Sequence, residues 1–249
     1  MNDLLTVTDQ MNREVTFSFP PQRIISLVPS QTEFLLDIGA PVLGRTKFCI
    51  HPSEKVKDLE IIGGTKQFRF DTIKGLKPDL IIGNKEENYR EGIAELSKEY
   101  PVWMSDIYTL DDAFMMMKSL GKICDLKTES DGVVKQCKSA LKTVKGRYSE
   151  KVIYLIWKDP WMAAGKNTFI DHLLTFLGYE NLIAQDRYPD VTTKQISNLN
   201  PDKILLSSEP YPFKDLHLAE AKGQWPNAKS QLVDGELYSW YGSRLKNWK

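Results

Sequence analysis

Residues that could do metal, nucleophilic or phosphate chemistry are few in this sequence, and none has the spacing that such chemistry needs. The three histidines, His51, His172 and His217, include no pair at the i, i+4 spacing that places two metal ligands on one helix face. The three cysteines form no C-x-x-C pair. The segment 163–168 contains Gly-Lys but lacks the first glycine of a phosphate-binding loop. The sequence therefore predicts no metal site and no resident cofactor.

Carboxylates are the groups left for acid–base catalysis. Glu87 and Glu209 follow stretches that we expect to be strands, and either can act as a general acid or base if an apolar wall raises its pKa. No nucleophile or second base stands beside them in the sequence. The first hypothesis is therefore a binding protein without catalytic residues, and an enzyme that uses the same cleft is the alternative.

Aromatic and amide side chains gather directly after the expected strands. They occupy the segments 29–31, 84–90, 157–161, 207–213 and 238–241. Ligands of open α/β sheets bind at the carboxyl ends of the strands, and pockets between lobes are apolar with a few polar groups. The sequence thus favours a ligand pocket lined by aromatic faces and amides.

Two similar halves supply the elements that would position these loops. FDTIKGLKPDLIIG (70–83) and KQISNLNPDKILLSS (194–208) each indicate a short helix, a Pro-Asp turn and a buried strand. Apolar runs at 23–28 and 152–157 precede them, each followed by a loop and a helix that stops at a glycine. Alternating strands and helices predict mostly parallel sheets, and the repeat predicts two α/β lobes.

Capping signals and apolar spacing predict where several helices begin and end. Ser30 is the expected N-cap of the first helix, with Glu33 completing a capping box. The corresponding helix of the second half is expected from Thr168 to Leu177, with Gly178 as its stop. Between the halves, helical spacing runs through 110–124 and resumes after 128 without a Gly/Ser/Pro-rich linker, so we expect the lobes to be joined by helix.

Composition excludes several classes of protein. The 249 residues contain 33 Lys plus Arg and 33 Asp plus Glu, so no whole-chain field attracts nucleic acid. No apolar run approaches the roughly 18 residues of a membrane helix. The first residues lack the basic segment, apolar stretch and cleavage site of a signal peptide. We expect either a protein that stays in the cell or a leader missing from this sequence.

Several segments in order resemble one family. They are 6–40 (TVTDQMNREVTFSFPPQRIISLVPSQTEFLLDIGA), GGTK (63–66), LKPDLIIGNKEEN (76–88), WKDPWMAAGKNTFIDHLLTFLGYENL (157–182) and SSEPYPFKDLH (207–217). The chain resembles the class III, helical-backbone substrate-binding proteins of ABC transporters for vitamin B12, ferric siderophores or haem, and most of all the cobalamin-binding branch. The resemblance implies two Rossmann-like α/β lobes, 1–127 and 149–249, bridged by one long helix, 128–148, with the ligand in a cleft between the lobes.

The resemblance also implies which residues meet the ligand. They are Pro29, Ser30, Gln31, Lys47, Phe48, Thr65, Lys66, Trp157, Trp161, Tyr188, Trp240 and Tyr241. Aromatic faces suit the plane of a corrinoid or haem, and Ser, Gln and Lys suit its rim. Cobalamin is the expected ligand, while the lysines and Arg90 keep an anionic ferric siderophore open, with haem beside it.

The family implies an ABC permease dimer as partner of a monomeric binding protein, with one acidic docking residue on each lobe. Glu91 and Asp215 are the expected docking residues, although Arg90 occupies the family's acidic position in the first lobe. The family also implies a periplasmic or otherwise extracytoplasmic location. A cytoplasmic carrier of a corrinoid or another metal chelate, without a transporter, is the alternative.

Overall fold

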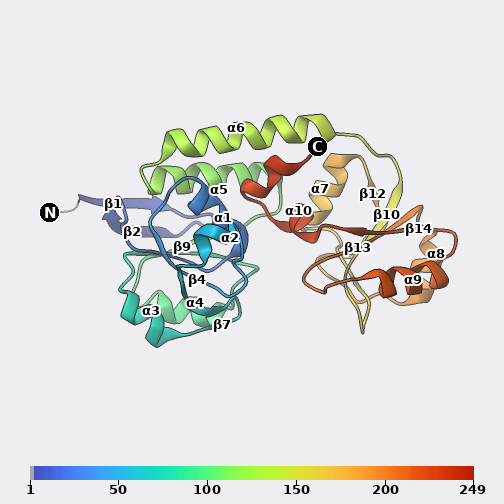
Figure 1. Cartoon of the computed structure of the whole chain (residues 1–249), viewed down its shortest axis with the longest axis horizontal. Coiled ribbons are helices and arrows are strands. Elements are labelled where there is room, and N and C mark those ends of the chain that lie inside the picture. Colours follow the sequence, from blue (N-terminus) through green and yellow to red (C-terminus); the bar gives the residue numbers. More distant parts are fainter. Residues whose placement is uncertain (1–2) are drawn as a thin grey trace. The chain divides into compact units, whose positions relative to one another are not determined.

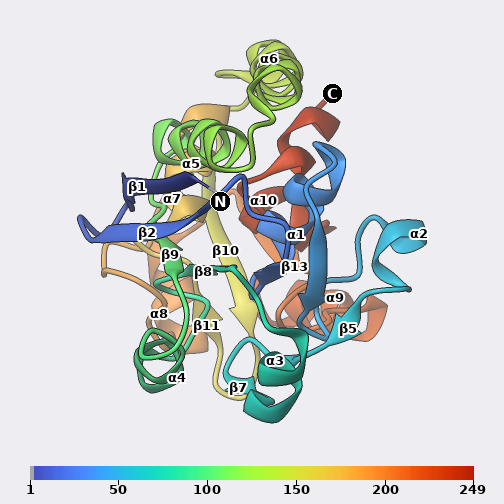
Figure 2. The same cartoon turned by 90° about the vertical axis from the view of Figure 1, so that its left-hand side faces the viewer.

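The computed structural model describes residues 3–249, and the chain forms two compact units. The first comprises the described residues up to Ile107, Asp111–Lys138 and Tyr241–Lys246. The second comprises Tyr108–Leu110, Ser139–Trp240 and Asn247–Lys249. Each unit is built on its own mostly parallel sheet, which confirms the predicted α/β fold class (Figures 1 and 2).

The five-stranded sheet of the first unit is entirely parallel, in the order β5-β4-β3-β8-β9. Its strands are β3 (Ile24–Ser26), β4 (Val42–Arg45), β5 (Glu60–Ile61), β8 (Leu80–Asn84) and β9 (Val102–Ser105). Every residue of β3 and β8 is buried, as expected of central parallel strands covered on both faces. The strand order reverses between β3 and β8, and their carboxyl ends are therefore where such a sheet binds ligands.

Helices and two-residue strands join or follow the strands of the first sheet. They are α1 (Pro29–Asp37), α2 (Ser53–Val56), β6 (Gly63–Gly64), β7 (Gln67–Phe68), α3 (Phe70–Leu76), α4 (Arg90–Leu96), α5 (Leu110–Ile123) and α6 (Lys127–Val144). α5 and the first part of α6 lie side by side (Figures 1 and 2), and Ser130 Oγ of α6 donates to the Met117 carbonyl of α5 at 2.9 Å. Gly121 permits this approach, because a Cβ there would overlap Ser130.

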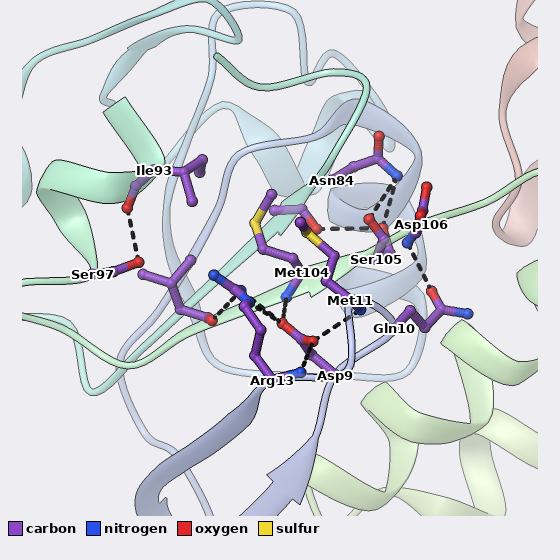
Figure 3. A network of polar contacts seen from close by, with 12 residues as sticks. Asp9, Gln10, Met11, Arg13, Asn84, Ile93, Ser97, Met104, Ser105 and Asp106 are labelled. Carbon is purple, nitrogen blue, oxygen red and sulfur yellow. Dashed lines mark hydrogen bonds and ion pairs between the residues drawn. The ribbon is translucent and has the colours of Figure 1, made fainter. Parts of the chain in front are cut away.

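A buried carboxylate fixes the antiparallel hairpin of β1 (Asp3–Thr8) and β2 (Glu14–Phe19) to the first sheet (Figure 3). Asp9 Oδ2 accepts hydrogen bonds from Arg13 Nη2 at 2.6 Å and from the amide of Met104 in β9 at 3.2 Å. An ion pair of this kind is costly to break from one side, because the remaining charge stays buried.

The sheet of the second unit has the order β11-β10-β13-β14, with β12 also paired to β10. Its strands are β10 (Lys151–Trp157), β11 (Met162–Ala163), β12 (Glu180–Asn181), β13 (Lys203–Ser207) and β14 (Lys229–Val233). Only β11 runs antiparallel to its neighbour. The order reverses at β10 and β13, so their carboxyl ends are the expected ligand edge of this unit.

The helices of the second unit cover both faces of that sheet. They are α7 (Phe169–Leu177), α8 (Thr193–Leu199), α9 (Asp215–Gln224) and α10 (Gly235–Ser239). The 3₁₀ turn at Ser243–Asn247 that follows in sequence lies almost entirely in the first unit. Ile196 of α8 and Ala221 of α9 belong to the same core cluster as Leu155 and Leu206, so these helices cover one face. On the other face, Tyr154 contacts Tyr238 of α10 with ring centroids 5.2 Å apart.

Two aspartates confirm the predicted internal repeat, because they make equivalent hydrogen bonds in the two units. Helices α3 and α8 both end in a left-handed residue, Lys77 with φ +46° and Asn200 with φ +47°. Asp79 then accepts from the amide of Arg23 at 2.9 Å, and Asp202 accepts from the amide of Lys151 at 2.8 Å. In each unit the Pro-Asp turn therefore ties the start of one strand to the start of its neighbour.

Two predicted helix boundaries are wrong. The expected capping box at Ser30 and Glu33 does not form, because Pro29 starts α1 and Val28 is its N-cap without a side-chain hydrogen bond. Glu33 is paired with Arg244 instead. The long helix predicted to reach Tyr148 ends at Val144, because Gly146 adopts φ +63° and its amide donates to the Phe176 carbonyl of α7. By contrast, α7 has the predicted Thr168 cap and Gly178 stop.

Candidate functional site

An amide network joins the carboxyl ends of β3, β8 and β9 in the first unit. Gln31 Nε2 and Asn84 Nδ2 both donate to the Ser105 hydroxyl, the latter at 2.9 Å (Figure 3 shows Asn84 beside Ser105). Asn88 accepts from the Asn84 amide at 2.9 Å and donates to the Leu27 carbonyl at 3.3 Å. The network fixes the loops that lead into α1 and α4, where ligand residues are expected.

The residues predicted after β4 and in the β6–β7 turn come together in the structure. The Lys47 amide donates to the Gly63 carbonyl at 2.8 Å. Phe48 is 50% exposed, and its ring lies over Gly64, where an added Cβ would be 3.3 Å from it. The Thr65 carbonyl accepts from Asn88 Nδ2 at 3.2 Å, which ties this turn to the amide network. We call Gln31, Lys47, Phe48, Thr65 and Asn88 the first-unit face.

Lys66 lies in the same turn but is not a free cation for a ligand. Its Nζ donates to the Glu86 carbonyl at 2.7 Å. The bond connects the β6–β7 turn to the loop after β8. Any anionic ligand would have to compete with this contact.

Tyr241 reaches the start of α1 from the far end of the sequence. A Cβ on the neighbouring Gly242 would lie 2.5 Å from the Ser30 carbonyl, so only glycine allows this approach. Ser30 is 3% exposed and Tyr241 6%, while Pro29 is half-buried. The structure therefore brings these predicted residues together but leaves little side-chain surface of Ser30 and Tyr241 for a ligand.

Trp157 is the exposed aromatic residue at the ligand edge of the second unit. It ends β10, is 40% exposed, and meets Tyr211 edge-on with ring centroids 5.4 Å apart. Tyr211 is held in place because its amide donates to the Ile156 carbonyl at 3.3 Å and its hydroxyl lies 3.1 Å from His217 Nε2. Trp157 thus offers a supported ring face to solvent.

Trp161 is predicted to meet the ligand, but it lies in the core. Its ring stacks on Phe213 with centroids 5.9 Å apart and an interplanar angle of 6°, and it is 9% exposed. Lys158 covers it from 5.6 Å and is paired with Glu220 at 2.5 Å. This packing argues against stacking of Trp161 on a ligand.

Trp240 is also buried, and a carboxylate fixes it. Glu209 Oε1 accepts from Trp240 Nε1 at 2.8 Å and from the Ser239 hydroxyl at 2.6 Å. Burial raises the pKa of Glu209 above its usual range; the Ser239 hydrogen bond opposes this shift, and the charge of Glu236 adds to it. We call Trp157, Tyr211, Glu209, Ser239 and Trp240 the second-unit face.

Tyr188 is half-buried in the loop after β12. The guanidinium carbon of Arg187 lies 5.5 Å from its ring centroid and 5.7 Å from that of Tyr108. Arg187 Nη1 donates to the Asn167 carbonyl at 2.8 Å, and the amide of Gly165 donates to the Arg187 carbonyl. Tyr188 therefore stands on a fixed loop, and its role in ligand binding stays a prediction.

The two predicted docking residues lie in the first turns of helices. Glu91 is exposed in α4, and Asp215 is exposed as the first residue of α9. A carboxylate in a first turn is favoured by the helix dipole, which suffices to explain its presence there. Arg90 is exposed beside Glu91. Nothing in their surroundings assigns them a partner.

Within residues 3–249 there is no group of three or more His, Cys, Asp or Glu side chains placed to hold a metal ion. None of the helices in that range combines the length and the apolar composition needed to cross a membrane. Cys49, Cys124 and Cys137 are free and buried, and burial raises the pKa of each thiol.

The named ligand residues expected from the sequence omit Asn84, Asn88, Glu209 and Tyr211, although the segments 84–90 and 207–213 include all four, and they miss Ser105 altogether. Asn84 and Ser105 end β8 and β9, whereas Asn88, Glu209 and Tyr211 follow β8 or β13 within four residues, so closeness to a strand end is the signal the sequence contains. Choosing among loop residues requires the strand order, because only the loops beside β3, β8, β10 and β13 flank the points where that order reverses.

Relatives in sequence are binding proteins. An uncharacterized ABC transporter substrate-binding lipoprotein, YvrC of Bacillus subtilis (strain 168), is 28% identical over 218 residues, 81% of this chain and 68% of YvrC. The vitamin B12-binding protein of Vibrio campbellii (strain ATCC BAA-1116) is 26% identical over 223 residues, 86% of this chain and 78% of that protein.

A solved structure with the same fold is that of the siderophore-binding protein BauB, bound to a complex between two molecules of acinetobactin and ferric iron. It has a TM-score of 0.81 at 18% identity, and the match covers 98% of this chain and 95% of BauB. At that identity the likeness carries the fold and not the ligand.

A sequence profile of one family, described as periplasmic binding protein, matches residues 24–225. The match covers well over half of the chain and includes β3, β8, β10 and β13. It confirms the family resemblance drawn from the sequence segments. The chain belongs to the periplasmic binding protein family.

Proposed function

We propose that this protein is the substrate-binding protein of an ABC importer, and that it captures a metal chelate with a broad planar face and delivers it to a permease. Cobalamin is the first candidate ligand, and a ferric siderophore or haem comes next. Family membership and the relative named for vitamin B12 support this proposal. A substrate-binding protein of an importer works outside the cytoplasmic membrane, and we propose that location here.

The observation that carries the proposal is the exposed ring of Trp157 at the point where the strand order of the second sheet reverses. Such an edge is where open α/β sheets bind ligands. A large, supported aromatic face in that place suits a flat macrocycle. Phe48 offers a second exposed ring at the corresponding edge of the first sheet.

The charges at the second-unit face favour a neutral rim over an anionic one, while the first-unit face contributes one exposed lysine, Lys47. Lys66 and Lys158 are engaged with the Glu86 carbonyl and the Glu220 carboxylate. The second-unit face carries the carboxylate of Glu209 and no basic residue. Cobalamin has an amide-bearing periphery, whereas haem and many siderophores carry carboxylates, and this difference supports cobalamin.

One observation favours a second candidate, an enzyme acting at the same face. The raised pKa of Glu209 is the property expected of a general acid or base. Its hydrogen-bond partners are Ser239 and Trp240, however, and neither is a base that would activate a nucleophile. We therefore expect bound ligand to be recovered chemically unchanged, which mass spectrometry of the released ligand tests.

A calorimetric titration tests the proposal. Purified protein is titrated with cyanocobalamin, hemin and a panel of ferric siderophores, with ligand-into-buffer injections as blanks. We expect saturable one-to-one binding of cyanocobalamin with a Kd of about 1 μM or below. Binding of a siderophore or hemin alone would replace the ligand but keep the binding-protein function. Absence of binding to every chelate would overturn the proposal.

A further inference from the structure

Hydrogen bonds fix the backbone of Glu209 just after the carboxyl end of β13. Its amide donates to the Ser207 hydroxyl at 3.3 Å, and its carbonyl accepts from the same hydroxyl at 2.5 Å. The Ser208 amide donates to the Val233 carbonyl at 3.0 Å, and the Gly235 amide donates to Ser208 Oγ at 2.9 Å. The loop that carries Glu209 is therefore tied to both β14 and the start of α10.

Gly235 brings the start of α10 close against the side chain. A Cβ at Gly235 would lie 2.6 Å from Glu209 Cγ and would also overlap the Ser207 hydroxyl. No other residue fits there without a shift. The stem of the Glu209 side chain is thus confined before any ligand arrives, which lowers the entropy that binding would cost.

The two carboxylate oxygens of Glu209 differ in their surroundings. Ser239 Oγ and Trp240 Nε1 both donate to Oε1, at 2.6 and 2.8 Å. Glu209 is half-buried, and among residues 3–249 no side chain or amide donates to Oε2. One oxygen therefore fixes the carboxylate, and the other remains as an oriented acceptor.

The setting makes this acceptor selective. Glu209 lies two residues from Tyr211, which supports the exposed ring of Trp157. Two further carboxylates, Asp234 and Glu236, act on it with like charge. A fixed, partly desolvated carboxylate in a negative field accepts hydrogen bonds from N–H groups and repels other carboxylates.

We propose that Glu209 is the specificity-determining residue of the second-unit face: Oε2 accepts a hydrogen bond from an amide N–H on the ligand's rim, and its charge rejects rims that carry carboxylates. The inference rests on the proposed function and deepens it by naming the ligand class as amide-rimmed chelates. A site built to bond an N–H group rejects an analogue that lacks it, because the buried acceptor is left unpaired.

The test compares cyanocobalamin with its monocarboxylic acid derivatives, in which one side-chain amide has been hydrolysed to a carboxylate. Titrations use the wild-type protein, Glu209→Gln, and Glu180→Gln as a matched control. Glu180 is exposed and lies in β12, whose backbone pairs with the amino end of β10, away from the ligand edge. Glutamine keeps the shape of Glu209 and an oxygen for Ser239 and Trp240, and thermal unfolding checks that the variant is folded.

We expect the wild-type protein and Glu180→Gln to bind cyanocobalamin about tenfold or more tightly than at least one of the monocarboxylic acids. Glu209→Gln should reduce that ratio to near one, because glutamine has no charge to repel a carboxylate and can donate to it. The decisive quantity is the ratio of the two affinities, because a loss of affinity common to both ligands leaves that ratio unchanged.

Three results would overturn the inference, and they separate it from the proposed function. An unchanged ratio in Glu209→Gln, with normal cyanocobalamin binding, removes the role of Glu209 and leaves the proposed function standing. An equal loss of affinity for both ligands means that Glu209 acts only by fixing Trp240. Tight binding of hemin with no binding of cyanocobalamin contradicts the ligand class, and binding of no chelate contradicts the proposed function itself.

Discussion

Exposure distinguishes one of the six tryptophans from the rest. Trp157 is 40% exposed, whereas the most exposed of the other five, Trp161, is 9% exposed. The five buried rings contribute to the cores of the units. Among the six tryptophans, only Trp157 presents a face that a ligand can cover without local unfolding, so the aromatic contribution of the second unit to binding should be concentrated in this side chain.

We predict that Trp157→Ala weakens cyanocobalamin binding by about 1–4 kcal/mol, since loss of a stacked anchor in an interface costs that much. Trp157→Phe should recover part of the loss because it keeps a ring face. Isothermal titration calorimetry measures both. The control is Leu199→Ala, which removes another exposed apolar side chain, 39% exposed, at the end of α8. Equal affinities in Trp157→Ala and wild type would exclude an aromatic contact at this position.

Loop positions could be predicted at the residue scale, but exposure could not. The sequence placed Trp157, Trp161 and Trp240 after strands, and all three lie near the carboxyl ends of the second sheet. Their burial depends on partners distant in sequence, because Phe213 stacks on Trp161 and Glu209 bonds Trp240. A pattern of residue types along one chain segment contains no information about such partners.

At the scale of elements, α1 is fixed by ion pairs with a segment distant in sequence and not by the local capping box that its residues predict. Ser30 and Glu33 have the spacing of a capping box, yet Glu33 is paired with Arg244 at 3.0 Å and Asp37 with Lys246 at 2.7 Å. The segment Tyr241–Lys246 therefore fastens along α1 within the first unit. By contrast, α7 and its Thr168 cap follow from local residues alone, and the sequence predicted them correctly.

We predict that Arg244→Ala lowers the free energy of unfolding by about 2–4 kcal/mol at neutral pH, because it leaves the Glu33 carboxylate desolvated and without its partner. The side chains of the pair are only 11% and 12% exposed, so water screens it weakly. Urea unfolding of the wild type, Arg244→Ala, Glu33→Gln and the double variant measures the effect as a cycle. In the Glu33→Gln background, the loss of Arg244 should cost much less.

The same pair gives the variant a defined pH dependence. Burial raises the pKa of Glu33 above its usual value of 4.5, and Arg244 opposes that shift. Without Arg244 the folded-state pKa rises further, so the folded state of the variant holds its proton to higher pH than the unfolded chain does. The free energy of unfolding that Arg244→Ala loses relative to the wild type is therefore largest at neutral pH and shrinks as the pH falls towards 4.5. A deficit that stays constant across this range would show that the ion pair is not its cause.

At the scale of the whole molecule, the sequence predicted the fold class because each half repeats the same succession of elements. Asp79 and Asp202 make equivalent bonds in the two units, so the repeat in sequence is a repeat in structure. The return of the C-terminal segment to the first unit could not be predicted. Tyr241–Lys246 belongs to the first unit although its sequence neighbours belong to the second, and only long-range contacts with α1 determine this.

The proposed delivery to a permease would involve the whole molecule, and its test needs one change in each unit. We predict that Glu91→Ala combined with Asp215→Ala leaves cyanocobalamin affinity unchanged but lowers uptake by at least about tenfold, because each change removes one partner of an interfacial ion pair. Uptake of labelled cyanocobalamin by proteoliposomes containing the cognate permease measures the rate. The matched control is Asp58→Ala with Glu180→Ala, which removes one exposed carboxylate from each unit outside α4 and α9. An uptake rate equal to that of the wild type would reject both docking residues, whereas a loss in the control as well would attribute the effect to net charge.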